Sequence, residues 1–185
     1  MPRQHFILGM LLVFLLAAGT PLPSVAQNPN ATDIVRALTP KPRAPAVRGL
    51  GTPNRGITVE GGEATSPPPS IDLQVNFEFD SSNLTNDARL TLMALGDALK
   101  TKELATLRFR IIGHTDSRGT AEYNMDLSKR RAETVRSHLM QFHSIAADRL
   151  EAEGKGKTEL IDPNNPEAGI NRRVQILTIG PMASR

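Results

Sequence analysis

The chain has 185 residues, with 22 Lys and Arg side chains, 19 Asp and Glu side chains and no cysteine. The lack of cysteine excludes disulfides, thiolate metal sites and a cysteine nucleophile. Residues 71–185 carry as many acidic as basic side chains, and the chain contains one Tyr and no Trp. This balance argues against nucleic-acid binding, which favours a basic surface and aromatic stacking platforms.

Residues 1–26 are typical of a secretory signal peptide. The apolar run from Phe6 to Ala18 is shorter than the roughly 20 residues that a membrane-spanning helix needs. The segment that follows the run contains the small-x-small pattern Ser24-Val25-Ala26, which predicts cleavage after Ala26. We therefore expect an exported protein, and an uncleaved membrane anchor is the alternative. A lipid anchor at the mature N-terminus would need a cysteine at the cleavage point.

Residues 27–70 have the composition of a flexible linker. Prolines and glycines recur throughout this segment, and its apolar residues show no sustained period. Such a segment buries too little surface to offset the entropy of ordering it. The stretch 31–38 is compatible with a short helix capped by Thr32, but a helix of this length is not stable by itself in water.

The ordered domain is expected to span residues 71–185. Residues 71–79 alternate apolar and polar side chains and predict a strand. A helix should follow, capped by Thr85 and ending near Thr101, with Leu92, Leu95 and Leu99 buried. Further along the chain, the pattern predicts a strand at 107–113, a helix at 122–142 and strands at 149–156 and 172–180. This order indicates an α+β two-layer sandwich, β-α-β-α-β(-β), with a mixed sheet and both helices on one side.

One charged residue falls on the apolar face of the second predicted helix. At about 100° per residue, the apolar positions Leu127, Val135, Leu139 and Phe142 share one face. Arg131 lies on that face together with Asn124 and Ser128, whereas Arg130 lies on the solvent side. A guanidinium that leans on a sheet is costly without a partner.

Asp116 is the anion nearest to Arg131 in this arrangement, because it follows the strand that the helix must cover. Two interpretations are open. The pair is an internal salt bridge that fixes the loop to the helix, or the two charges stand apart at the mouth of a pocket. In the second case Arg131 binds a ligand carboxylate and Asp116 binds a ligand ammonium, which would suit a free amino-acid group.

Three segments carry a family resemblance: VNFEFDSSNLT (75–85), GHTDSRGTAEYNMDLSKRRAETV (113–135) and GINRRVQI (169–176). They resemble the peptidoglycan-binding domain shared by the outer-membrane protein A family, peptidoglycan-associated lipoprotein and flagellar-motor stator proteins. The resemblance covers about residues 71–181. It implies a non-catalytic periplasmic protein that binds the meso-diaminopimelate of the cell-wall stem peptide and contributes to envelope integrity.

The resemblance also implies the residues that contact this ligand. Asp116 and Arg131 would hold its amino and carboxylate groups. Thr120, Asn124, Leu127 and the pair Phe79-Asp80 correspond to further contacts of the family. No cofactor is expected. Residues 27–70 are too few to supply a membrane barrel, so the mode of attachment to the envelope stays open, with the cell wall or another envelope protein as the anchor.

Other signals in the sequence are discounted. Gly156-Lys157-Thr158 matches the end of a phosphate-binding loop, but residue 151, where the first glycine should stand, is Glu. His114 and its neighbours are too close in sequence to form a hydrolytic triad, and His114 is expected to satisfy local backbone groups. Glu151 and Glu153 are typical of a solvated strand face.

The pair Arg172-Arg173 is interpreted as structural. Consecutive residues of a strand point to opposite faces, so one arginine should be solvated and the other should brace the loop 157–170.

Two functions other than wall binding remain as alternatives. The basic, Pro-rich segment 27–70 would serve an envelope protein–protein interaction module. A cell-wall hydrolase would need a zinc or acid–base constellation, which the sequence does not show.

Overall fold

The computed structural model describes residues 29–41, 67–78 and 80–182. The predicted signal peptide and most of the predicted linker therefore lie outside the described residues. No helix in the described part of the chain is long and apolar enough to cross a membrane.

A mixed four-stranded sheet forms the centre of the domain. Its strands are β1 (Ser70–Leu73), β2 (Leu107–His114), β3 (Leu150–Gly156) and β4 (Val174–Pro181), in the spatial order β1-β4-β2-β3. β2 and β3 are parallel, and β4 runs antiparallel to both β1 and β2. The predicted α+β architecture and the order of its elements are confirmed.

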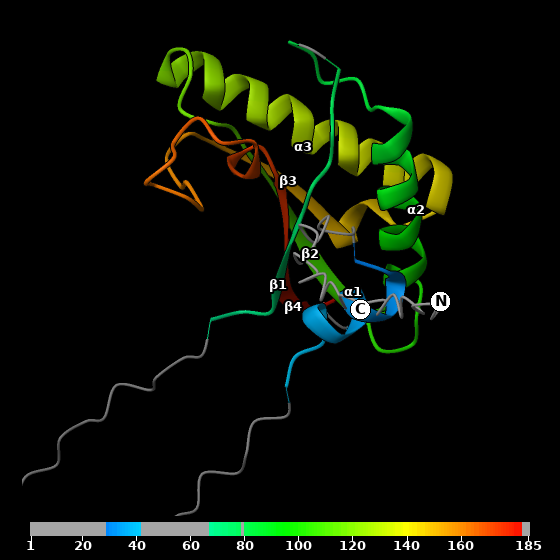
Figure 1. Ribbon diagram of the computed structural model, residues 1–185. Coiled ribbons are helices and arrows are strands. Elements are labelled where there is room, and N and C mark those ends of the chain that lie inside the picture. Colours follow the sequence, from blue (N-terminus) through cyan, green and yellow to red (C-terminus); the bar gives the residue numbers. More distant parts are fainter. Residues whose placement is uncertain (1–28, 42–66, 79, 183–185) are drawn as a thin grey trace, which may run out of the picture.

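Two long helices, α2 (Asn86–Leu99) and α3 (Ala121–His143), cover the sheet and cross one another (Figure 1). Thr85 caps α2 as predicted, because its side chain accepts a hydrogen bond from the Ala88 N–H. The helices and the sheet share one core, whose largest fully buried side chains include Leu92, Leu95, Leu99, Phe109, Ile111, Leu139 and Ile176.

The first strand is shorter than predicted. β1 ends at Leu73, whereas the alternating pattern predicts a strand up to residue 79. Val174, the partner of Leu73, is the first residue of β4, so the sheet offers no further pairing beyond it. The alternation still sets burial, since Val75 is buried and Phe77 is half-buried next to the core, where it bridges to Leu84.

Part of the predicted linker is a helix, α1 (Ala31–Leu38). Its N-cap is Asn30, whose side chain accepts from the Asp33 N–H, so the prediction of Thr32 as the cap is wrong.

α1 packs against the domain beside the foot of α2 (Figure 1). Ile34 and Leu38 are fully buried, and the Leu38 carbonyl accepts a hydrogen bond of 2.8 Å from the Thr178 hydroxyl of β4. The interpretation of residues 27–70 as a linker throughout is therefore wrong for 31–38. A helix that is too short to be stable by itself gains its stability from tertiary burial of one apolar face.

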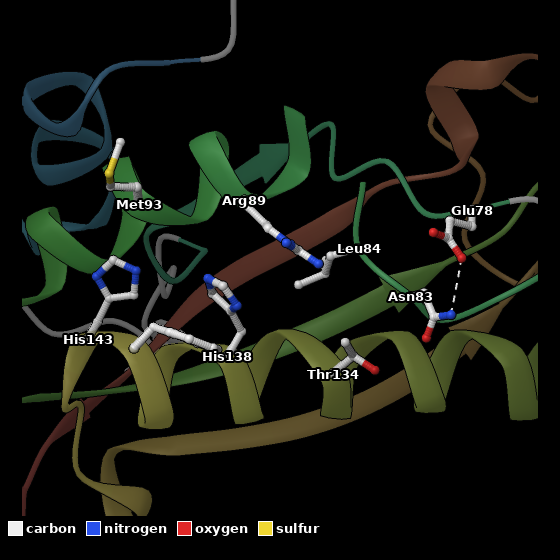
Figure 2. Close-up of a pocket in the computed structure, with 9 residues that line it drawn as sticks. Glu78, Asn83, Leu84, Arg89, Met93, Thr134, His138 and His143 are labelled. Atoms are coloured by element: carbon white, nitrogen blue, oxygen red, sulfur yellow. Dashed lines mark hydrogen bonds between the residues drawn. The ribbon is translucent and has the colours of Figure 1, made fainter. Parts of the chain in front are cut away.

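The helical wheel is wrong for Phe142, whose side chain is 71% exposed. A helix of 23 residues is about 34 Å long, which exceeds the roughly 26 Å of an eight-residue strand, so its last turn has little sheet to cover. In that turn it is the His143 ring that lies against Gly96 of α2. An open groove of about 660 Å³ remains between α2 and α3, with Arg89, Met93 and His138 on its walls (Figure 2).

Gly113 and Gly156 allow α3 to approach the sheet closely. A Cβ atom at Gly113 would lie 2.2 Å from the backbone oxygen of Ser128 on α3. Gly156 has a φ angle of +54°, and its N–H donates a 2.9 Å hydrogen bond to the Ser128 hydroxyl. The N-terminal half of α3 is thereby held over the carboxyl ends of β2 and β3.

The burial of α1 generates a stability prediction. Leu38→Ala should lower the free energy of unfolding by about 2–4 kcal/mol, because it removes a fully buried side chain and leaves a cavity. Leu90→Ala on α2 is the matched control, since Leu90 is 62% exposed and should change stability by less than about 0.5 kcal/mol. Urea denaturation followed by circular dichroism measures both, and equal effects would contradict the packing of α1.

Candidate ligand-binding site

A cleft of about 620 Å³ opens beyond the carboxyl end of β2. Its walls come from the loop after β2, the first turns of α3, the segment around Phe77 and Arg172 before β4. Its charged side chains are Glu78, Asp80, Asp116, Arg118, Arg131 and Arg172. The cleft thus carries three acidic and three basic side chains, beside the apolar surfaces of Phe77 and Leu127.

Asp116 is buried and forms ion pairs with two arginines. Its Oδ2 accepts hydrogen bonds of 2.6 Å and 3.2 Å from Arg118 and one of 2.9 Å from Arg172. Its Oδ1 accepts a hydrogen bond from the backbone N–H of Arg118. Burial raises the pKa of Asp116, but these hydrogen bonds outweigh it and hold the pKa below its usual value.

The hypothesis of an internal Asp116–Arg131 salt bridge is wrong. In the described residues, the ion-pair partners of Asp116 are Arg118 and Arg172, and no carboxylate lies within ion-pair distance of Arg131. Asp116 turns towards Arg118 in its own loop and towards Arg172 before β4, while both Asp116 and Arg131 line the cleft.

Arg131 is half-buried and is held without a carboxylate partner in the described part of the chain. Its Nε donates a 3.1 Å hydrogen bond to the Ser81 carbonyl, and its guanidinium carbon lies 4.9 Å from the centre of the Phe77 ring. Desolvation lowers the pKa of Arg131, although an arginine stays protonated in proteins. The cation–π contact and the hydrogen bond to the carbonyl hold the guanidinium at the lining of the cleft.

Three further predicted contacts line the same cleft. Asn124 is buried, and its side-chain amide donates a 2.6 Å hydrogen bond to the Arg118 carbonyl. Leu127 is buried below the cleft floor, and Asp80 accepts a hydrogen bond from the Tyr123 hydroxyl at the rim. Asp80 has a φ angle of +49°, which turns the chain back after the first strand.

One predicted contact is not brought to the cleft. Among the described residues, Thr120 does not line the cleft. It is the N-cap of α3, with its hydroxyl accepting from the Tyr123 N–H. Phe79 lies outside the described residues.

A second loop braces the Asp116 loop. The Lys157 ammonium donates to the carbonyls of Ser117 and Gly119, at 3.3 Å and 2.9 Å. The Ser117 N–H donates to the Pro166 carbonyl. The lysine of the discarded phosphate-loop pattern is therefore a structural brace.

Sequence reasoning missed the roles of Arg118, Tyr123 and Arg172. Arg118 stands two residues after Asp116, and at this spacing the two side chains of one loop can form an ion pair. The sequence could therefore have predicted the Asp116–Arg118 pair. The structural interpretation of the Arg172-Arg173 pair is half right. Arg173 is buried and braces the 157–170 loop through the Glu159 carbonyl, but Arg172 pairs with Asp116 instead of being merely solvated.

His114 does not satisfy local backbone groups, so that expectation is wrong. Both ring nitrogens of His114 are buried without a hydrogen-bond partner among the described residues. The carboxylates of Glu151 and Glu153 pair with Arg108 and Arg110 across the strands. In the described part of the chain, no group of three or more His, Asp or Glu side chains is placed to hold a metal ion.

The sheet order, the two crossing helices and the cleft at the end of β2 define an α+β domain with a charged, open ligand cleft. The model of the OmpA family matches residues 76–173, which include all the described residues that line the cleft. The chain belongs to the OmpA family.

Individual relatives agree with this assignment. Outer membrane porin F of Pseudomonas aeruginosa is 32% identical over 124 residues, which cover 66% of this chain and 35% of the porin. Peptidoglycan-associated lipoprotein of Legionella pneumophila is 32% identical over 133 residues, which cover 70% of this chain and 73% of the lipoprotein. The chain thus spans about a third of the porin's length.

The fold has solved counterparts. The periplasmic domain of Helicobacter pylori MotB superposes with a TM-score of 0.53 at 20% identity, over 63% of this chain and 78% of that one. At this level of identity the likeness concerns the fold.

The ion pairs of Asp116 generate a pH prediction. Because the folded-state pKa of Asp116 is lowered, its ionised form stabilises the fold above the ordinary value of 3.8, and this stabilisation is lost as pH falls through the lower folded pKa. At pH 7, Asp116→Asn should lower the free energy of unfolding by about 1–3 kcal/mol, and the difference from the wild type should shrink in acid.

Urea denaturation at a series of pH values measures this difference. Asp126→Asn is the matched control, because Asp126 is exposed and pairs with Arg130 on the solvent side of α3. It should change the free energy of unfolding by less than about 0.5 kcal/mol. If the difference in unfolding free energy between Asp116→Asn and the wild type stays constant into the acid range, the lowered pKa of Asp116 is contradicted.

Proposed function

We propose that this protein is a non-catalytic peptidoglycan-binding protein of the periplasm, and that its cleft binds the meso-diaminopimelate of the stem peptide. Arg131 binds a carboxylate of the ligand, and Asp116 binds an ammonium group. The name of the Legionella pneumophila relative, peptidoglycan-associated lipoprotein, supports the substrate, and the names of the relatives support a location in the cell envelope.

The observation that carries the proposal is the unpaired charge of Arg131 in a cleft of mixed charges. A guanidinium offers a planar fork of donors that matches a carboxylate, and Arg131 has no carboxylate of the described residues to occupy it. A half-buried cation without an anion is costly, and a ligand carboxylate would offset this cost.

Asp116 retains capacity for an ammonium group. Its Oδ2 is shared by two arginines, but its Oδ1 accepts one hydrogen bond from the described residues, that of the Arg118 backbone N–H. A carboxylate oxygen has two lone-pair sites, so a second donor fits there. Arg118 is largely exposed in its pair with Asp116 and is free to move aside when a ligand enters.

The binding should be modest and reversible. A short peptide branch offers little contact area, so the affinity depends on a few charge-assisted hydrogen bonds. The alternative function is an envelope interaction module that acts through residues 27–70. No contact of the described residues supports it, and it stays a prediction.

Arg131→Ala should weaken co-sedimentation of the purified protein with peptidoglycan sacculi by roughly 10–100-fold, the equivalent of about 1.5–3 kcal/mol for hydrogen bonds to a charged group. The neighbouring substitution Arg130→Ala is the matched control, because Arg130 is exposed and pairs with Asp126. Arg130→Ala should pellet like the wild type. A thermal melt of each variant shows that it is folded.

A wild-type protein that stays in the supernatant would overturn the proposed function. Equal pelleting of Arg131→Ala and Arg130→Ala would place wall binding elsewhere on the molecule.

Competition with small molecules tests the identity of the ligand. Free meso-diaminopimelate should release the wild-type protein from sacculi, whereas pimelate, which has both carboxylates and neither amino group, should release much less. The physical reason is that pimelate offers Arg131 a carboxylate but offers Asp116 no ammonium. Equal release by the two compounds would contradict the role of Asp116.

A further inference from the structure

A second cavity of about 290 Å³ lies beside the cleft and shares Phe77, Arg131 and Arg172 with it. Its lining also includes His114, Arg173 and Gln74. Among the described residues that line it, three are arginines and none is an aspartate or glutamate. An arginine-rich cavity without a lining acid is a strongly positive environment.

His114 lies in the wall of this cavity and is 2% exposed. In the part of the chain that the structure describes, neither of its ring nitrogens has a hydrogen-bond partner, which is uncommon for buried polar groups and asks for a physical explanation. Burial, followed by the charge of Arg173, lowers the pKa of His114 to about 4, so the ring is neutral at pH 7. A neutral imidazole carries one N–H, and in His114 this donor is buried in the cavity wall.

The charges around the cavity are incompletely balanced. Arg173 pairs with Asp72 at 2.6 Å, and Arg172 pairs with Asp116 at 2.9 Å. Arg131 has no carboxylate partner in the described part of the chain. Beyond the lining, the other charged groups that act on His114 are Glu159 and Lys155, which have opposite signs. One uncompensated positive charge therefore remains beside an unpartnered N–H donor.

We propose that this cavity is a binding site for an oxyanion, separate from the cleft that takes the ammonium and carboxylate groups. Guanidinium donors of Arg131 and Arg172 would bind its oxygens, beside the buried ring of His114 in the cavity wall. The volume suits a small group, at the lower end of the range for ligand sites. The oxyanion is a carboxylate of a wall peptide or a free phosphate, which share this chemistry. The site shares Arg131 with the cleft of the proposed function and differs from it in its lining residues His114, Gln74 and Arg173.

The test is a titration of the full chain with inorganic phosphate, and separately with acetate, at pH 7 and constant ionic strength set with sodium chloride. The ring nitrogen resonances of the histidines are followed by ¹H–¹⁵N NMR. His138 and His143 are internal controls, because they lie in the groove between α2 and α3 and outside this cavity. The His114 resonances should shift and saturate, while those of His138 and His143 stay in place.

Gln74→Glu is the informative variant, because it places a carboxylate in the cavity wall at a half-buried position whose amide makes one long hydrogen bond of 3.5 Å. It should weaken oxyanion binding at least about tenfold, through like-charge repulsion at close range. Gln141→Glu, an exposed position on α3, makes the same chemical change and should titrate like the wild type.

The outcomes separate the sources of the anion and decide the proposal. A saturable shift with phosphate but not acetate supports a phosphate site, and a shift with acetate supports a carboxylate site. No shift of His114 with either anion overturns the proposal, and so does an equal shift of His114, His138 and His143. Equal affinities of Gln74→Glu and Gln141→Glu also overturn it. A negative titration would not change the sedimentation expected for Arg131→Ala.

Discussion

The close contact between α3 and the ends of β2 and β3 is the constraint on which the rest of the domain depends. At Gly113 and Gly156 the helix backbone comes so near the strands that a side chain would clash with it. The hydroxyl of Ser128 accepts the N–H of Gly156 across this contact. Interiors packed at this density transmit small changes of position, so the contact sets where the first turns of α3 stand. The cleft is built from those turns and from the loop that leaves β2.

The same contact explains how the charges are distributed. With α3 fixed over the sheet, Arg131 is held against Phe77 and the Ser81 carbonyl, and Asp116 stays with Arg118 and Arg172. The two charges that the sequence suggested as a pair therefore face a shared cleft as separate groups. Arg131 therefore has no carboxylate partner among the described residues, whereas Asp116 is paired with two arginines. Arg131 lines both the cleft and the neighbouring arginine-rich cavity.

Much of the fold and part of the site could be predicted because local patterns carry them. The alternation of residues 71–79 and the wheel of residues 123–142 placed the buried faces, and the wheel selected Arg131 over Arg130. The same reasoning failed for Phe142, because a wheel assumes that a helix is covered along its whole length. It also failed for the partners of Asp116, because Arg172 is 56 residues away in the chain. No local sequence pattern predicts a contact between two residues that lie so far apart in the chain. The sequence around His114 likewise does not predict that its ring nitrogens are buried without a hydrogen-bond partner among the described residues.

The sequence by itself determined the order of helices and strands, the buried stripe of each and the motif residues that gather near the end of β2. These features follow from periodicity, capping and spacing, which act over a few residues. The tertiary structure decided the rest. It buried α1 in a segment with a linker composition, since the free energy of burying Ile34 and Leu38 arises only once a core exists to receive them. It also chose the ion-pair partners of Asp116, because an ion pair depends on the distance between charges in space and not on their separation along the chain.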